Sequence, residues 1–215
     1  MASPTTATST HPPQLDLLAP LGRATARLTA ELASARRTVL GAGAWIDYLP
    51  GWVDGHQTLH DALREDVQWR VDRRVMYERE IETPRLLARF PRDGLLPAVL
   101  AEAGERLGAH YGIALDGVSA AFYRDGRDGV AMHGDRVGRD VTETIVAIVS
   151  LGAPRRFLLK PVAGGPSLRL SPGEGDLLVM GGTCQRTWLH GIPKVRTAGA
   201  RISVQYRMDG PGKSP

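Results

Sequence analysis

The sequence predicts an α+β protein, mainly β, whose C-terminal half folds as a sandwich or jelly roll. Eight short β-prone runs follow Gly112, separated by turn signals such as Asp125-Gly126 and Pro172-Gly173. The runs are 118–124, 130–133, 144–151, 156–160, 167–170, 176–180, 187–190 and 201–207. The half before Gly112 instead carries helix-like periodicity. The 215 residues suffice for one substantial core, so we expect a single domain over residues 15–209.

The N-terminal half is expected to supply helices and short strands that pack against this β core. Leucines at roughly helical spacing predict a helix near residues 23–37. Short strands are expected at 38–40 and 44–48, and the run 58–67 predicts a helix capped by Thr58. A further helix is expected from about residue 95 to 111, with its apolar stripe toward the core.

The two ends of the sequence and its single cysteine indicate the cellular compartment of the protein. Residues 1–14 have no basic start and no apolar block, so we expect a disordered tail and no signal peptide, and residues 210–215 are expected to be a flexible C-terminus. No run approaches the roughly 18 apolar residues of a membrane span. A lone Cys184 excludes an intramolecular disulfide and suits a reducing compartment. We expect a cytoplasmic monomer in which Cys184 packs as a small hydrophobe.

Basic charge is concentrated in arginine. The formal charge is +4 and the sequence pI about 9.6, which is compatible with a nucleic-acid partner and equally with a basic surface kept for solubility. Residues 69–90 interleave arginines with aromatic residues. This pattern can contact phosphates and stack on unpaired bases. The alternative is a strand hairpin whose Val71, Val75 and Tyr77 face the core while its arginines are solvated.

A metal site is indicated by His133-Gly134-Asp135. Side chains two residues apart on an extended segment point to the same face, so His133 and Asp135 can bind one metal. A third ligand from His190 would complete a face of two histidines and one carboxylate. Such a face leaves coordination positions open and suits ferrous iron that must also bind a co-substrate and dioxygen.

The last β-prone run carries a second signal. Arg201, Ser203, Gln205 and Arg207 alternate with apolar residues and therefore share one strand face. Two buried arginines on one face would be very unfavourable without anionic partners. A dicarboxylate co-substrate meets this requirement, because planar guanidinium groups bind carboxylates in bidentate fashion.

Taken together, these segments resemble the AlkB family of iron(II) and 2-oxoglutarate-dependent dioxygenases, most closely its actinobacterial branch. The resemblance extends from about Ala44 to Arg207. The segments that carry it are Pro84-Arg85-Leu86, Phe122-Tyr123-Arg124-Asp125-Gly126, His133-Gly134-Asp135, Val149-Ser150-Leu151-Gly152, Gly175-Asp176-Leu177-Leu178-Val179-Met180, Trp188-Leu189-His190-Gly191-Ile192-Pro193 and Arg201 to Arg207.

The resemblance implies a double-stranded β-helix (jelly roll) core with N-terminal helices and a nucleotide-recognition hairpin lid at 69–90. It implies Fe2+, 2-oxoglutarate and O2 as cofactors. The implied metal-binding and catalytic residues are His133, Asp135 and His190. The implied residues of the 2-oxoglutarate site are Arg201, Arg207, Tyr123 and Ser203. The implied substrate-binding residues are Tyr77, Arg79, Arg85 and Trp188, although packing in the pocket wall is the favoured alternative for Trp188.

The implied activity is oxidative demethylation of N-alkylated nucleobases of the 1-methyladenine and 3-methylcytosine type in DNA repair. The expected partner is alkylated DNA, with single-stranded DNA or RNA as alternatives. Three positions depart from the family pattern: Ala121 and Ser203 stand where members often carry asparagine, and Val137 replaces a carboxylate near the damaged base. Two alternatives therefore stay open. One is the same chemistry on RNA, protein or a small metabolite, and the other is a non-catalytic nucleic-acid-binding relative.

Overall fold

The structure is a computed structural model that describes residues 25–76, 79–91, 94, 96–135 and 141–208. The side chains of residues 72–83 also lie outside the description. The expectations for residues 1–14, 210–215, Tyr77 and Val137 therefore concern parts of the chain that the structure does not describe.

The described chain is mainly strand, with a few helices. The strands are β1 (Arg27–Leu28), β2 (Arg36–Gly41), β3 (Ala44–Leu49), β4 (Val53–Asp54), β5 (Arg70–Met76), β6 (Arg79–Phe90), β7 (Gly117–Tyr123), β8 (Val130–His133), β9 (Val146–Gly152), β10 (Phe157–Pro161), β11 (Leu168–Leu170), β12 (Asp176–Gly182), β13 (Trp188–Ile192) and β14 (Arg201–Arg207). The helices are α1 (His56–Asp66), α2 (Ala98–Tyr111) and α3 (Cys184–Thr187), together with a 3-10 turn, η1 (Leu32–Ser34).

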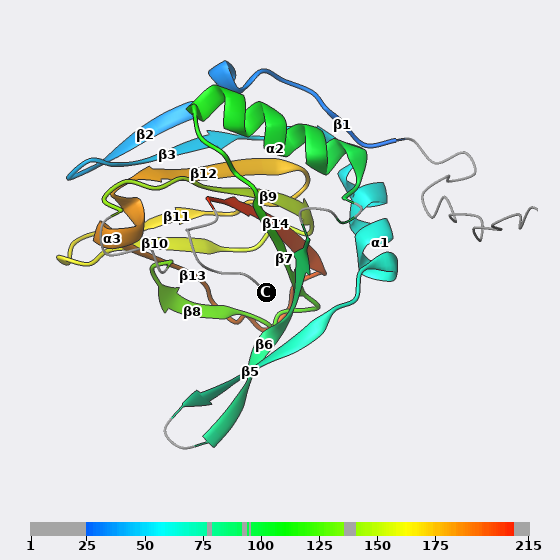
Figure 1. Cartoon of the computed structure of the whole chain (residues 1–215). Coiled ribbons are helices and arrows are strands. Elements are labelled where there is room, and N and C mark those ends of the chain that lie inside the picture. Colours follow the sequence, from blue (N-terminus) through cyan, green and yellow to red (C-terminus); the bar gives the residue numbers. More distant parts are fainter. Residues whose placement is uncertain (1–24, 77–78, 92–93, 95, 136–140, 209–215) are drawn as a thin grey trace, which may run out of the picture.

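Two antiparallel sheets form the body of the molecule (Figure 1). The larger has the strand order β2-β3-β12-β9-β14-β7-β6-β5, and the smaller has the order β11-β10-β13-β8. The short strands β1 and β4 pair separately. Chain neighbours β8 and β9, and β12 and β13, lie in different sheets, so the chain alternates between the two layers. The predicted jelly roll is confirmed.

The space between the sheets is filled by one of two apolar clusters. Phe157, Leu159 and Ile192 of the smaller sheet belong to it, together with Ile148 and Leu178 of the larger sheet. Cys184 is buried in this cluster, as expected for a small hydrophobe, and burial raises the pKa of its thiol to about 12. This inter-sheet layer is the surface on which a site between the sheets is built.

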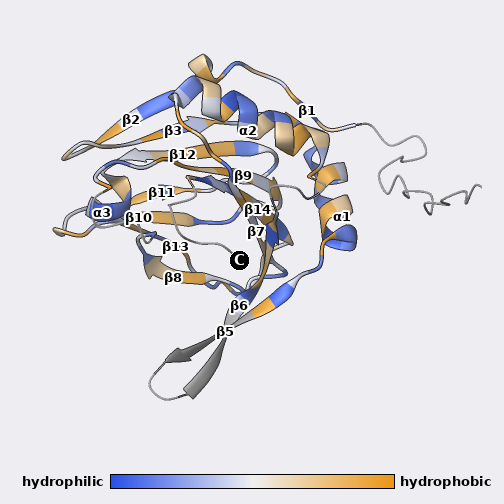
Figure 2. Cartoon of the chain, viewed as in Figure 1, coloured by the Kyte–Doolittle hydropathy of each residue, from blue (hydrophilic) through white to orange (hydrophobic). Residues whose placement is uncertain are grey.

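The second cluster lies on the other face of the larger sheet, which α1 and α2 cover (Figure 1). Leu59 of α1 and Leu100 of α2 pack there with Ile202 and Val204 of β14. Both helices carry apolar and polar residues along their length, as Figure 2 shows. The strand β14 therefore sends alternate residues to the helices and to the inter-sheet space, as its sequence pattern predicts.

The prediction of a helix near residues 23–37 is wrong. From residue 25 to 37 the chain contains β1, the turn η1 and the start of β2, which pairs with β3. A few leucines at helical spacing are a weak local signal, and backbone pairing with distant strands overrides it. The other two helices are present with shifted starts: α1 begins at His56 after Gly55, whose φ of +69° suits glycine, and α2 begins at Ala98.

The segment 69–90 contains a β-hairpin made by β5 and β6, which projects from the body (Figure 1). Val71 is 45% exposed, so the interpretation in which it packs in the core is wrong for this residue. Val75 and Tyr77 belong to the side chains outside the description. Across the described ranges, no helix has the length and apolar character needed to cross a membrane.

Candidate active site

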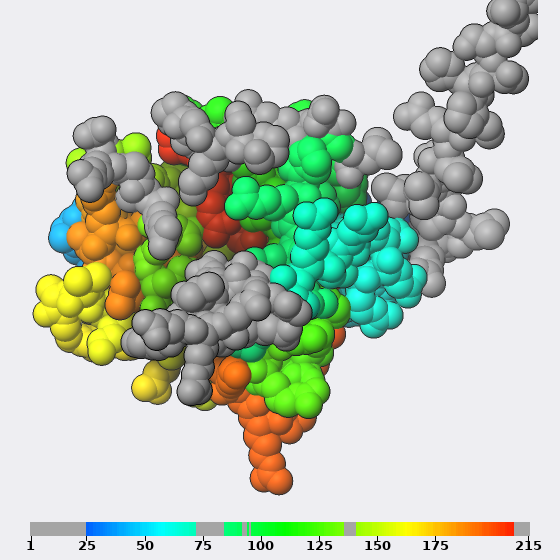
Figure 3. All heavy atoms as spheres, turned by 60° about the horizontal axis from the view of Figure 1, so that its bottom comes forward, coloured from blue at the N-terminus to red at the C-terminus, as the bar shows by residue number. Residues whose placement is uncertain are grey.

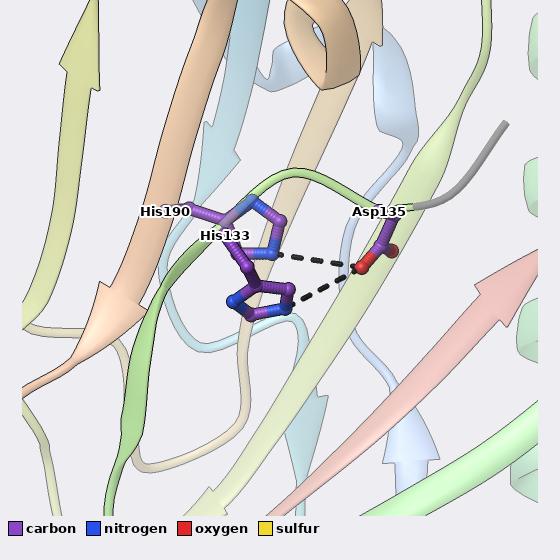
Figure 4. Close-up of side chains that lie close together, drawn as sticks. All are labelled: His133, Asp135 and His190. Atoms are coloured by element: carbon purple, nitrogen blue, oxygen red, sulfur yellow. Dashed lines mark ion pairs between the residues drawn. The ribbon is translucent and has the colours of Figure 1, made fainter. Parts of the chain in front are cut away.

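Three side chains meet at one end of the inter-sheet space. His133 ends β8 and lies opposite His190 of β13 in the antiparallel register, and Asp135 follows two residues after His133. His133 Nε2 is 3.5 Å and His190 Nε2 is 3.9 Å from Asp135 Oδ1. Figure 4 shows both imidazole rings directed toward this carboxylate. The structure thus brings together the three residues that the sequence proposes as metal ligands.

The donor set fits a divalent transition metal. Within the described ranges, His133, Asp135 and His190 are the group of metal-ligating side chains whose atoms all lie within 4.8 Å of one another. Donors about 2.0–2.2 Å from a common ion are separated by about 3 Å at a right angle, close to the spacing observed. Two imidazoles and one carboxylate on one face, with open positions beside them, suit iron(II).

The electrostatics of the site favour the protonation states that bind metal. Burial, with the neighbouring His133 ring, lowers the pKa of His190 to about 4, so its imidazole is neutral at physiological pH. Burial alone would raise the pKa of Asp135, but the hydrogen bond with His133 and the charge of Arg207 hold that pKa below its ordinary value. A neutral imidazole and an ionised carboxylate are the ligand forms.

Asp135 is held from two sides. Arg207 Nε donates to Asp135 Oδ2 at 2.7 Å, and the backbone N–H of Asp135 donates to Gln185 Oε1 at 2.9 Å. Gly134 passes close to α3, where an added Cβ would lie 2.6 Å from the Gln185 carbonyl oxygen. Glycine is therefore required between the two proposed ligands. Gln185 was missed by the sequence reasoning, since nothing in its local pattern indicates a contact 50 residues away.

Arg201 lies at the buried end of β14 and places a positive charge in the protein interior. Its side chain is 0% exposed, and Nη2 donates to Ser150 Oγ at 2.7 Å. Its Nε and Nη1 are buried and have no hydrogen-bond partner among the residues that the structure describes. The guanidinium carbon lies 5.4 Å from the ring centre of Tyr123, which is opposite Arg201 in the strand register. Burial lowers the pKa of Arg201 to about 10, and the group remains a cation at neutral pH.

The unpartnered donors of Arg201 are the observation that fits a carboxylate ligand. A buried guanidinium with free N–H groups is unfavourable until an anion accepts them. The terminal carboxylate of 2-oxoglutarate is such an anion. Ser150, which accepts from Arg201, was not assigned a role from the sequence. The sequence clue to Ser150 was a hydroxyl within a β-prone run. The structure shows that every residue of that strand, β9, is buried.

The four alternating residues of β14 follow a gradient of burial. Arg201 and Ser203 are buried, whereas Gln205 and Arg207 are partly exposed. The end of the molecule that carries the hairpin shows a hollow in which atoms of β14 are visible, coloured red in Figure 3. Arg207, which is partly exposed and hydrogen-bonded to Asp135, is at the less buried end of the strand. The prediction of two buried arginines is therefore correct for Arg201 alone. Arg207 is partly exposed and has Asp135 as its anionic partner.

The structure describes the side chains of two of the four proposed substrate-binding residues, Arg85 and Trp188. Arg85 of β6 lies close enough for its charge to contribute to the lowered pKa of His190. Its Nε is buried and has no hydrogen-bond partner within the described part of the chain. Trp188 packs against the inter-sheet cluster and lines a groove of about 610 Å³ together with Leu40 and Val162. The side chains of Tyr77 and Arg79 lie outside the description. That groove includes none of the proposed metal ligands, so the role of Trp188 toward a substrate stays a prediction.

A second buried arginine, Arg155, supports the strands that carry the histidines. It donates to the carbonyl oxygens of Asp125 at 2.9 Å, Asp128 at 2.8 Å and Pro193 at 3.2 Å. Those carbonyls belong to the turn before β8 and to the segment after β13. Arg155 was also missed by the sequence reasoning, because backbone acceptors leave no mark in a sequence.

The chain is similar in sequence to a known family of oxygenases. The family model described as the 2OG-Fe(II) oxygenase superfamily matches residues 38–207. The chain is similar to alpha-ketoglutarate-dependent dioxygenase alkB homolog 3 of Rattus norvegicus, at 26% identity over 183 residues that cover 74% of this chain and 62% of that protein. It is 25% identical to the Homo sapiens protein of the same name over 185 residues, which cover 74% and 64%. The chain thus spans about three-fifths of the length of these relatives.

Solved structures share the fold. That of OsALKBH1 superposes with a TM-score of 0.58 at 14% identity, covering 81% of this chain and 100% of that one. A prolyl hydroxylase from Trichoplax adhaerens, in complex with a hypoxia inducible factor peptide fragment, superposes with a TM-score of 0.55 at 11% identity, covering 75% and 83%. The chain belongs to the 2OG-Fe(II) oxygenase superfamily, and its predicted relationship to the AlkB family is confirmed.

Proposed function

We propose that this protein is an iron(II) and 2-oxoglutarate-dependent oxidative demethylase of N-alkylated nucleobases, of the 1-methyladenine and 3-methylcytosine type, acting in DNA repair. One observation carries the proposal. The cluster of His133, Asp135 and His190 shares one inter-sheet space with Arg201, a buried arginine whose free donors need an anion. The cluster can bind a metal, and Arg201 can bind one carboxylate of a dicarboxylate that also reaches this metal.

In this proposal His133, Asp135 and His190 would hold iron, and Arg201, Tyr123 and Ser203 would receive a carboxylate of 2-oxoglutarate. Arg207 keeps Asp135 ionised and oriented through its 2.7 Å hydrogen bond. When bound with dioxygen, iron and 2-oxoglutarate supply the oxidation that hydroxylates an N-methyl carbon, while the co-substrate becomes succinate and carbon dioxide. The hydroxymethyl product then releases formaldehyde.

Three observations support a nucleic-acid substrate. The relatives named alkB homolog 3, the formal charge of +4 and the arginine-rich segment 69–90 favour a phosphate-bearing substrate. A base within a duplex must leave the stack to reach a recessed metal, and an arginine and aromatic lid can hold the displaced strand. We assign Tyr77, Arg79 and Arg85 to that contact, with Trp188 as part of the wall.

The test is formaldehyde release from oligonucleotides that carry 1-methyladenine or 3-methylcytosine, compared with unmethylated oligonucleotides. Release should require both iron(II) and 2-oxoglutarate, and His133→Ala should abolish it. Absence of formaldehyde from a folded, metal-binding protein would refute the repair function. If 2-oxoglutarate is consumed but methylated DNA does not stimulate its consumption, the substrate is RNA, protein or a metabolite. DNA binding that is salt-sensitive, unchanged in His133→Ala and without turnover would indicate the non-catalytic relative.

A further inference from the structure

The inward faces of β7 and β14 carry a chain of hydrogen bonds that begins at the proposed metal ligand. Arg207 donates through Nε to Asp135 and through Nη1 to Ser119 Oγ at 3.2 Å. Ser119 Oγ lies 3.2 Å from Gln205 Oε1. Gln205 Nε2 lies 2.9 Å from the Ser203 carbonyl oxygen and 2.5 Å from Ser203 Oγ. The chain thus runs from Asp135 along β14 toward Arg201.

The direction of each hydrogen bond in this chain is fixed by chemistry. Arginine can only donate, so Ser119 Oγ accepts from Arg207. The Ser203 carbonyl can only accept, so the amide atom of Gln205 that faces it must be the nitrogen, and the amide oxygen must face Ser119. The Ser119 hydroxyl therefore donates to Gln205, and Gln205 donates to Ser203.

This polarity determines what the Ser203 hydroxyl can do. Its oxygen is occupied as an acceptor, so its proton must point away from Gln205. Ser203 is 2% exposed, and within the described residues no acceptor for that proton is recorded. Ser203 lies beside Ser150 in the strand register and on the same face as Arg201. The free proton and the free guanidinium donors are thus presented in one buried layer.

We propose that Gln205 and Ser119 are positioning residues that aim the Ser203 hydroxyl at bound 2-oxoglutarate. A serine standing where the family often carries asparagine is thereby given a fixed donor direction. The inference rests on the family's co-substrate and on no particular oxidised substrate. It is therefore testable whether or not the protein acts on nucleobases.

The experiment is calorimetric titration of 2-oxoglutarate into protein loaded with manganese(II), whose ligand preference is close to that of iron(II). Gln205→Leu should weaken 2-oxoglutarate binding about threefold to tenfold, the equivalent of about one net hydrogen bond. Gln205→Glu keeps the shape but replaces the donor with an acceptor that takes the Ser203 proton, so its loss should be larger. Manganese affinity should change less than about twofold in Gln205→Leu. The exposed Gln57→Leu is the matched control and should bind as the unchanged protein does.

Coupling separates positioning from general damage. Ser203→Ala should weaken 2-oxoglutarate binding as Gln205→Leu does, and the double variant should show no further loss, because both changes remove the same donor. In turnover assays Gln205→Leu should raise KM for 2-oxoglutarate and leave kcat at saturation nearly unchanged. Unchanged binding in Gln205→Leu, or losses that multiply in the double variant, would overturn the proposal. If Gln205→Leu does not fold, the isosteric Gln205→Glu gives the same decision: binding as tight as in the unchanged protein would overturn it.

Discussion

Replacing Arg201 by methionine should stabilise the 2-oxoglutarate-free protein and abolish co-substrate binding at the same time. Two of its three guanidinium nitrogens are buried with no partner in the described ranges, and an unsatisfied buried group costs about 1–3 kcal/mol. An apolar side chain of similar length removes that cost, so the free energy of unfolding should rise by about 1–4 kcal/mol. The single hydrogen bond lost to Ser150 offsets only part of this gain.

The assay is urea unfolding of manganese-loaded protein with and without 2-oxoglutarate. At a concentration 100 times its Kd, 2-oxoglutarate should stabilise the unchanged protein by about 2.7 kcal/mol and leave Arg201→Met unaffected. Arg155→Met is the matched control, because that buried arginine satisfies three carbonyl oxygens. The Asp125 carbonyl also accepts from the Asp128 N–H, so the loss of Arg155 removes the donor from the Asp128 and Pro193 carbonyls and should destabilise the fold by about 2 kcal/mol or more. The reasoning is refuted if Arg201→Met is as destabilising as Arg155→Met, or if it still gains stability from 2-oxoglutarate.

Three further predictions concern the support of the site and of the fold. Gln185→Leu removes the acceptor of the Asp135 backbone N–H, so manganese affinity should fall about 10-fold to 100-fold with folding intact, and unchanged affinity would contradict the role. Cys184 should resist thiol reagents at pH 8 in the folded protein, because burial raises its pKa to about 12, and rapid labelling would show that α3 opens. Burial alone would raise the pKa of Asp128, yet its hydrogen bonds from Arg124 lower it. The stability it contributes is present above the ordinary carboxyl pKa of about 4 and lost as pH falls through the lower folded value. Asp128→Asn should therefore flatten the acid limb of the unfolding curve, and an unchanged limb would exclude this contribution.

Much of the β core could be predicted from the sequence because strand period and turn residues are local signals. The run 201–207 coincides with β14, and its alternation places Arg201 on the inter-sheet side and Ile202 on the helix side. His133 and Asp135 are separated by one residue, so an extended segment predicts that they point the same way. Asp135 lies beyond the end of β8, where Gln185 and Arg207 hold it. Their meeting with His190 depends on the pairing of β8 with β13, which the sequence indicates only through the family resemblance.

Features that depend on distant partners could not be read from local patterns. Gln185 and Arg155 act on backbone atoms far along the chain, and backbone atoms are the same at every residue. The helix expected at 23–37 fails for a related reason. Pairing of β2 with β3 satisfies backbone groups in a way that the spacing of a few leucines does not reveal.

The most direct test of the iron and co-substrate site is a crystal structure of the protein grown without oxygen in manganese(II) and 2-oxoglutarate. Density for a metal is expected within bonding distance of His133, Asp135 and His190. Density for the dicarboxylate is expected to extend from that metal to the guanidinium of Arg201. A metal bound without all three ligands, or a dicarboxylate that leaves Arg201 unpartnered, would contradict the account.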